Sequence, residues 1–202
     1  MRIFFKTISY IFHPLLIPII GTFSYFLITP KYSPLELQSG NILPIFILTV
    51  IIPIIAFLIL RNIGLVSTVN LPTLKERRYP MLIHIILLLL VIYKVIPNNY
   101  IAELYYFFVG LMIATFAMTL LLFFKIKGSM HLMGMGCLFM YLVNLSIHFE
   151  INITIALSLL IFTTGLLATA RLYLKAHSRA ELFIGFCIGL ISQLLTVRYW
   201  LQ

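Results

Sequence analysis

Hydrophobic residues occur along the chain in seven long runs separated by short polar connections. The runs cover, roughly, residues 7–28, 42–60, 80–96, 101–124, 130–148, 152–170 and 182–201. A helix needs about 20 mostly apolar residues to cross the roughly 30 Å hydrocarbon layer of a bilayer. The pattern therefore predicts an all-α, polytopic transmembrane helical bundle of six or seven spans, with residues 1–202 forming a single integral membrane domain. The first and third runs are the least regular, and the third contains His84 and Lys94.

Prolines interrupt the first two runs. The first contains His13-Pro14 and Pro18, and the second contains Pro44 and Pro53. We expect kinks at these positions, because proline lacks the backbone N–H and neighbouring helices can accommodate the break. The first run lacks an Ala-x-Ala-like cleavage site, so we interpret it as a retained span.

The composition supports a membrane protein and argues against a water-soluble one. Apolar residues make up 62% of the chain and charged residues 9%, against about 45–50% and about 25% in ordinary soluble domains. A soluble protein of 202 residues could not bury so much apolar surface. Cys137 and Cys187 lie within apolar runs, without the spacing of metal ligands, and are interpreted as small packing residues.

The net charge of +9 is distributed unevenly. If all seven runs cross, 11 of the 14 basic residues share one side with the N-terminus, and the other side holds 3. The positive-inside rule places the basic side in the cytoplasm, as in a multi-pass protein of the plasma or inner membrane. Basic residues at the ends of apolar runs anchor helices and meet lipid phosphates, so we predict the bilayer, and no nucleic acid, as a partner.

Three connections on the basic side contain groups capable of chemistry. The second ends in Lys75-Glu76-Arg77-Arg78-Tyr79-Pro80, the fourth is Lys127-Gly128-Ser129-Met130-His131, and the sixth runs from Ala170 to Glu181. Two predicted spans separate each of these connections from the next. All three therefore reach the same side, where they could form one site.

The sixth connection resembles the third signature of the type 2 phosphatidic acid phosphatase superfamily, Ser-Arg-x5-His-x3-Asp. Here it reads Ala170-Arg171, five residues, His177, three residues and Glu181. Gly128-Ser129-Met130-His131 resembles the second signature, Pro-Ser-Gly-His. The segment from Lys75 to Pro80 resembles a degraded first signature, Lys-x6-Arg-Pro. The three occur in the family's order, which implies a phosphatase-like core over roughly residues 60–190.

The resemblance implies a role for each matching residue. His177 would attack phosphorus and form a phosphohistidine, Glu181 would orient its imidazole, and His131 would protonate the leaving oxygen. The phosphate oxygens would be bound by four further residues, Arg171, Arg78, Ser129 and Lys75. The implied substrate is a lipid phosphate or isoprenyl pyrophosphate. The implied chemistry needs no metal and no cofactor, and many bacterial members of the family work on the outer side of the plasma membrane.

The departures from the family pattern keep an alternative open. Met130 replaces a glycine, Ala170 a serine and Glu181 an aspartate, and Tyr79 separates Arg78 from Pro80. The chain is therefore either a divergent active phosphatase or a degenerate relative that serves as a lipid-binding or structural membrane subunit. A small transporter is a third interpretation, which the absence of evident internal repeats disfavours.

Simpler interpretations of the same residues also remain. Basic residues at helix ends are often topology anchors, and His177 and Glu181 could form a plain i, i+4 pair. Ser129 and His131 could cap and anchor the fifth span. Gly185 and Gly189 are typical of close helix packing. No motif supports the three remaining histidines, which are interpreted as interfacial or core groups: His13, His84 and His148.

Overall fold

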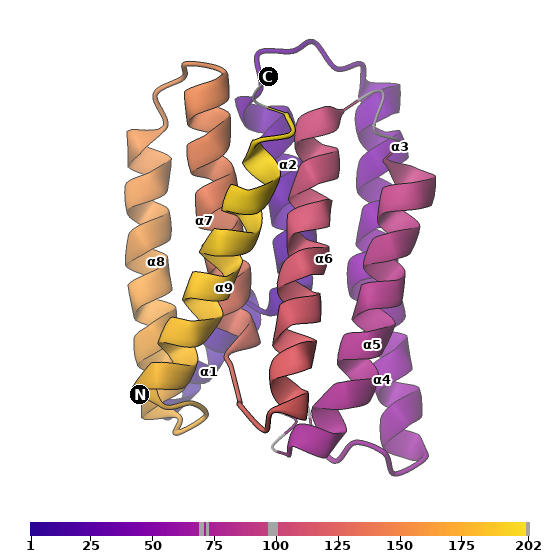
Figure 1. Ribbon diagram of the computed structural model, residues 1–202, viewed down its shortest axis with the longest axis vertical. Helices are drawn as coiled ribbons and strands as arrows, with labels where there is room; N and C mark the ends of the chain where they lie inside the picture. The colour runs from indigo at the N-terminus through magenta and orange to yellow at the C-terminus, as the bar shows by residue number, and fades with distance from the viewer. Residues whose placement is uncertain (69–70, 72, 97–100, 201–202) are drawn as a thin grey trace.

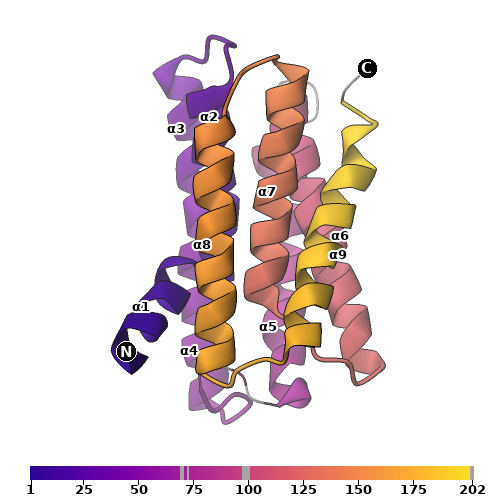
Figure 2. The same ribbon diagram turned by 90° about the vertical axis from the view of Figure 1, so that its left-hand side faces the viewer.

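The computed structural model describes residues 1–202 except 69–70, 72, 97–100 and 201–202. The described residues form an all-helical bundle without strands (Figures 1 and 2). Seven helical segments within this described part are long and apolar enough to cross a membrane. The predicted all-α bundle is confirmed, and seven segments have the length and composition that the prediction required of a span.

The first segment is divided into two helices. Helix α1 (Arg2–Ile11) is followed by a 3-10 turn (Pro14–Leu16) and helix α2 (Ile17–Ile28). Figure 2 shows α1 leaning away from the bundle. The side chain of His13 accepts a hydrogen bond from the Leu15 backbone N–H at 3.3 Å and caps the turn. The expected kink at His13-Pro14 is confirmed, although the helix before it begins at Arg2 rather than near residue 7.

The next two segments contain π-helical turns. Helices α3 (Leu35–Phe46) and α4 (Ile52–Asn62) join through the turn Ile47–Ile51. Helix α5 (Leu74–Leu90) continues into the turn Val91–Val95. Helix α5 begins six residues before the expected boundary at 80 because Thr73 caps it by accepting a hydrogen bond from the Glu76 N–H at 3.3 Å. The cluster from Lys75 to Tyr79 therefore lies on a helix and not in a connection.

The last four segments are close to their expected bounds: α6 (Ala102–Phe123), α7 (Met130–His148), α8 (Thr154–Tyr173) and α9 (Arg179–Val197). Helices α7 and α9 pack backbone against backbone. A methyl group added at Gly189 would lie 2.1 Å from the Met133 carbonyl oxygen, and one at Gly136 would lie 2.4 Å from that of Phe186. The interpretation of Gly189 as a packing glycine is confirmed.

The connections α4–α5, α6–α7 and α8–α9 all lie at one end of the bundle, near the start of α1 (Figure 1). We call this the basic end, and we call the end that holds the α2–α3 and α7–α8 connections the opposite end. The expectation that three polar clusters distant in sequence share one end is confirmed.

Candidate functional site

A cavity of about 760 Å³ opens at the basic end, between α1, α4 and α5 and the adjoining ends of α7 and α8. No carboxylate occurs among the described residues that line it. Uncompensated positive charge in a partly buried site favours an anionic ligand. The lining includes seven basic residues and four histidines: Arg2, Lys6, Arg61, Arg77, Lys127, Arg171, Lys175, His13, His84, His131 and His177.

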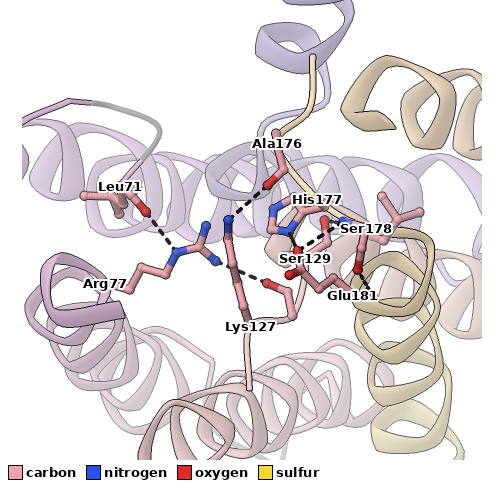
Figure 3. Close-up of polar contacts among 10 residues, drawn as sticks. Leu71, Arg77, Lys127, Ser129, Ala176, His177, Ser178 and Glu181 are labelled. Carbon is pink, nitrogen blue, oxygen red and sulfur yellow. Dashed lines mark hydrogen bonds and ion pairs between the residues drawn. The ribbon is translucent and has the colours of Figure 1, made fainter. Parts of the chain in front are cut away.

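His177 lies in the connection between α8 and α9, and its side chain is held by Glu181 (Figure 3). Its Nδ1 lies 2.7 Å from Oε2 of Glu181. With Nδ1–H donating to the carboxylate, the neutral ring carries its free lone pair on Nε2. His177 is only 8% exposed and lines the cavity. This is the arrangement that a nucleophilic imidazole requires.

The local sequence explains the position of Glu181. Ser178 caps α9, and Glu181 occupies the third position of the helix, so that the two residues form a capping box. The same Oε2 that contacts His177 also accepts a hydrogen bond from the Ser178 N–H at 3.3 Å. The carboxylate is therefore fixed from two sides.

Helix α9 is itself held against the start of α7. The Ser129 N–H donates to the Glu181 carbonyl oxygen at 3.0 Å. A methyl group at Gly185 would lie 2.4 Å from the Ser129 carbonyl oxygen. Gly185 therefore permits the close approach that places Glu181 and His177 beside the α6–α7 connection. Its expected role in helix packing is confirmed at this contact with Ser129.

The environment of His177 favours the neutral imidazole. Burial, together with the positive charges of Arg77, Arg171 and Lys127, lowers its pKa to about 4, although the hydrogen bond to Glu181 opposes this shift. The ring is therefore unprotonated near pH 7. Burial and the neighbouring arginines also lower the pKa of Lys127.

Two buried arginines lie in this part of the cavity. Arg171, near the end of α8, is 5% exposed, and its Nε has no hydrogen-bond partner among the described residues. Arg77, in the first turn of α5, is 8% exposed. Its guanidinium donates to the carbonyl oxygens of Leu71 at 3.0 Å and Gly128 at 3.2 Å (Figure 3). Arg77 thus links two connections, while Arg171 retains an unused buried donor.

Lys127 completes this group of cations. It enters from the α6–α7 connection and points between Arg77 and His177 in Figure 3. Its Nζ donates to the Ala176 carbonyl oxygen at 3.1 Å, directly before His177 in the chain. An ammonium group has three donors. Lys127 can therefore hold the connection in place and also face an anion.

His131 lies in the first turn of α7 and lines the same cavity. Its Nε2 lies 3.2 Å from the Ser9 carbonyl oxygen of α1. A carbonyl oxygen can only accept, so Nε2 carries a proton and Nδ1 is the nitrogen that gains or loses one. The ring of His13 packs edge-on against His131, with the ring centroids 5.4 Å apart.

The structure brings four of the expected site residues to the cavity: Arg171, His131 and His177 line it, and Glu181 contacts His177. It does not bring Lys75, Arg78 or Ser129 to it. Lys75 is exposed, and Arg78 lies over the ring of Phe123, 5.6 Å from its centroid. Ser129 is fully buried and caps α7 by accepting from the Leu132 N–H at 3.5 Å.

Helical periodicity explains why Arg77 lies at the cavity and Arg78 does not. Residues 77, 80, 81 and 84 follow the i, i+3, i+4, i+7 spacing of one helix face, and all four line the cavity. The family pattern directs attention to the arginine nearest the proline. With the start of α5 known, the shared face with Pro80, Met81 and His84 would have identified Arg77.

Comparisons with protein-family models, curated proteins and solved structures find no match to this chain. Two imidazoles are held in opposite tautomers, one with Nε2 free and one with Nδ1 free, beside three cations that share the single nearby carboxylate of Glu181. Among the described residues, no group of three or more His, Cys, Asp or Glu side chains is arranged to hold a metal ion.

Proposed function

We propose that this protein is a membrane-embedded phosphatase that hydrolyses a lipid phosphate ester through a phosphohistidine on His177. The observation that carries the proposal is the 2.7 Å contact between His177 and Glu181 inside a cavity lined by Arg77, Lys127 and Arg171. The three cations would bind the phosphoryl oxygens, taking the place expected for Lys75, Arg78 and Ser129. Charge that is already positioned for the transferring phosphoryl group lowers the barrier.

The reaction would proceed in two displacements. Nε2 of His177 attacks phosphorus and the bond to the ester oxygen breaks, while His131, which takes up a second proton on Nδ1 together with the anionic substrate, gives that Nδ1 proton to the leaving oxygen. Water then attacks phosphorus, with His131 as the base, and the N–P bond breaks to release inorganic phosphate. Glu181 stabilises the positive charge that the His177 ring acquires while it carries the phosphoryl group.

The walls of the cavity favour a lipid over a soluble ester. Besides the cations, the lining includes the large apolar residues Tyr10, Ile54 and Leu58. These residues are 61%, 46% and 54% exposed, respectively, so the cavity extends to the outer surface of the bundle between α1 and α4. A substrate could keep its chain in the bilayer with its phosphate in the cavity. The substrate class would thus follow from a polar site joined to an apolar opening.

The test is phosphate release by the purified protein in detergent, over a panel of lipid phosphates, compared with the variant His177→Gln. Rapid acid-free quenching should trap a phosphohistidine in the wild type and not in the variant. Lys125→Gln is the matched control, because Lys125 is exposed at the same end and does not line the cavity. Equal rates for wild type and His177→Gln would contradict the proposal.

One outcome would favour the alternative of a catalytically degenerate lipid-binding subunit. The departures from the family pattern lie close to the site: Met130 lines the cavity, and Ala170 is fully buried directly before Arg171. Tight binding of a lipid phosphate by the wild type, with neither turnover nor a trapped phosphohistidine, would support binding without catalysis.

We also propose that the basic end faces the cytoplasm, because it carries most of the basic residues. A cysteine introduced at Lys125 in a Cys187→Ser background provides the test, since Lys125 is exposed, Cys137 is buried and Cys187 is half-buried. An impermeant thiol reagent should label Lys125→Cys only after cells are opened. Labelling in intact cells would place the site on the outer face, where the family resemblance would favour it.

A further inference from the structure

Helix α1 leans away from the bundle in Figure 2 and nevertheless contacts the proposed acid, His131. One side of α1 packs on the bundle: Ile8 and Ser9 are buried. On the same side, the ring centroid of Phe5 lies 4.6 Å from that of Tyr173 on α8. The carbonyl oxygen of Ser9 lies 3.2 Å from Nε2 of His131. The position of α1 therefore bears directly on the orientation of the His131 ring.

Pro14 explains why the Ser9 carbonyl oxygen is available to His131. In a continuous helix, the carbonyl of residue 9 would accept from the N–H of residue 13, and that of residue 10 from residue 14. Pro14 has no N–H, and the His13 N–H donates instead to the Tyr10 carbonyl at 3.3 Å. The Ser9 carbonyl is thus released from the helix ladder, in a residue that is only 6% exposed. A buried carbonyl needs a donor, and Nε2–H of His131 donates to it.

The hydrogen bond to Ser9 determines which nitrogen of His131 can act. With Nε2–H donating to the carbonyl, the ring presents Nδ1 for proton transfer. A general acid must also lie within about 2.6–3.2 Å of the atom it protonates. Displacement of α1 would remove the partner that selects both this tautomer and this orientation. The backbone of Ser9 is therefore a positioning group for the proposed acid, and whatever seats α1 controls that acid.

The outer side of α1 is apolar, and the described part of the chain does not cover it. Ile3, Phe4 and Ile11 are 81%, 56% and 55% exposed. Their spacing places them on one side of the helix, away from the residues that pack on the bundle. None of the three lines the cavity. Large exposed apolar residues on an amphipathic helix are typical of a helix that buries one side in the membrane interface.

The charge of α1 identifies the kind of surface that would cover it. Arg2 and Lys6 lie four residues apart on another side of the helix, both are exposed, and α1 contains no acidic residue. Basic residues beside an apolar face attract the anionic headgroups of a bilayer. A second copy of the chain is a poorer partner for these cations, because it carries 14 basic residues against 5 acidic ones. An anionic bilayer surface suits both the apolar and the basic side.

We propose that α1 docks on an anionic bilayer surface and that this docking holds the Ser9 carbonyl against His131. The inference rests on the proposed function and adds a partner and a positioning element to the same site. With α1 seated, Nδ1 of His131 faces the leaving oxygen and gives its proton to an alkoxide as the bond to phosphorus breaks. The attack of His177 on phosphorus does not involve α1. A substrate whose leaving group departs without a proton should therefore be indifferent to docking.

The test uses two probes with the same chain, dodecyl phosphate and a nitrophenyl phosphate that carries a dodecyl group, with the full-length protein in bilayer nanodiscs. In the first displacement, which kcat/KM reports, the alkoxide needs a proton and the nitrophenolate does not. Ile3→Gln/Ile11→Gln should lower kcat/KM about 10-fold on dodecyl phosphate and less than about 2-fold on the nitrophenyl probe. The matched control, Ile155→Gln/Ile161→Gln on the exposed side of α8, should change both values by the same factor.

The lipid composition of the nanodisc is the second variable. Adding phosphatidylglycerol to phosphatidylcholine should raise the ratio of kcat/KM for dodecyl phosphate to that for the nitrophenyl probe several-fold in the wild type. The ratio should not change in Ile3→Gln/Ile11→Gln. Neither lipid is a phosphate monoester, and the shared chain and phosphate of the probes cancel the effect of surface charge on substrate binding. An unchanged ratio in the wild type would overturn the anionic surface as the partner.

Docking also has a readout that does not depend on activity. Trp200 is the one tryptophan of the sequence, so Phe4→Trp in a Trp200→Phe background reports on α1 alone. Phospholipids brominated along their acyl chains should quench this fluorescence and should not quench that of Lys125→Trp in the same background. Absence of quenching at position 4 would overturn the docking. A doubled protein mass per nanodisc that Ile3→Gln/Ile11→Gln halves would assign the apolar side to a second copy and overturn it as well.

The ratio of the two kcat/KM values does not depend on how much of a variant is folded, so it separates positioning of the acid from general stability. An equal loss on both probes in Ile3→Gln/Ile11→Gln, or no loss on either, would overturn the inference and leave the proposed function standing. Release of phosphate from neither probe by the wild type would contradict the proposed function together with the inference.

Discussion

The two ends of the bundle handle buried charge in opposite ways. At the opposite end, Glu103 is 2% exposed and is surrounded by partners: Lys31 pairs with it, Tyr25 Oη donates to it at 3.3 Å, and His148 Nε2 lies 3.4 Å away. At the basic end, Arg171 is also buried, at 5% exposed, but its Nε has no partner among the described residues. The charge of Glu103 is thus paired within the chain, whereas Arg171 keeps a buried donor that the proposed anion would use.

The comparison distinguishes a structural ion cluster from a binding site. Glu103 joins α2, α6 and α7, and its charge is neutralised within the chain. Leaving the charge of Arg171 unneutralised costs stability, which is the cost expected of a residue kept for the proposed anion site. Four experiments test this distinction, and the expected change decreases from the first to the last.

Removing the proposed nucleophile should have the largest effect. His177→Gln should lower phosphate release by roughly 10³-fold or more, because the covalent route is lost. Glu103→Gln, at the opposite end, should leave turnover per folded molecule within about 2-fold. Initial rates on one lipid phosphate, corrected for folded protein, provide the measurement. A comparable loss in both variants would show that the two ends are not functionally distinct.

The free energy of unfolding should change more in Glu103→Gln than in His177→Gln, the reverse of the order expected for the rates. Glu103→Gln should lower the free energy of unfolding by about 1–3 kcal/mol, because His148 and the half-exposed Lys31 lose their charged partner. His177→Gln should change it by less. Thermal unfolding in detergent, followed by circular dichroism, measures the difference. An unchanged melting temperature for Glu103→Gln would mean that this cluster does not stabilise the bundle.

An uncompensated arginine should make stability depend on anions. Arg171→Met should raise the free energy of unfolding by about 1 kcal/mol without ligand, because a buried charge is replaced by an apolar group of similar length. Orthovanadate at about 10 times its Kd should stabilise the wild type by about 1.4 kcal/mol. Arg171→Met should lose this response, and Arg171→Lys should keep part of it. An equal vanadate shift in Arg171→Met and wild type would place the anion elsewhere.

The smallest effect concerns pH. The proposed attack requires the neutral His177 ring, so kcat/KM of the wild type should be highest above the pKa of His177 and should fall as the pH drops through about 4. Lys127→Gln removes a positive charge and keeps a donor for the Ala176 carbonyl, so the pKa of His177 should rise. The acid limb should therefore move to higher pH by less than about one unit. The same substrate is used for both proteins, so that its own ionisation cancels, and a limb that stays or moves lower would contradict the assignment.

Much of the bundle could be predicted from hydropathy, because span length and composition are local properties of the sequence. The bounds of α7 agree with the expected run 130–148, and the shared location of the three polar connections follows once the spans are counted. The boundary of α5 was wrong because hydropathy excludes charged residues from a helix. Capping by Thr73 in fact extends that helix through Lys75 and Arg78.

The part of the candidate site that could be predicted is the part whose geometry follows from sequence spacing alone. His177 and Glu181 lie four residues apart across a helix start, so their contact follows from the sequence. Arg77 and Lys127 could not be selected over Arg78 and Lys75, because the choice depends on which face of α5 turns inward. His13 was missed for a different reason: it reaches the cavity only because α1 and α2 separate at the break, and this direction is set by packing against α7 and α8.

The glycine contacts between α7 and α9 have a mechanical consequence. With carbonyl oxygens 2.1–2.4 Å from where a methyl group would sit, neither helix can slide or rotate against the other without a backbone collision. Helices α3, α4 and α5 contain π-helical turns, where the backbone ladder is already irregular. A bilayer that grows thicker or thinner would therefore be accommodated by tilting in that half of the molecule, while the half that carries His131 and Glu181 keeps its dimensions.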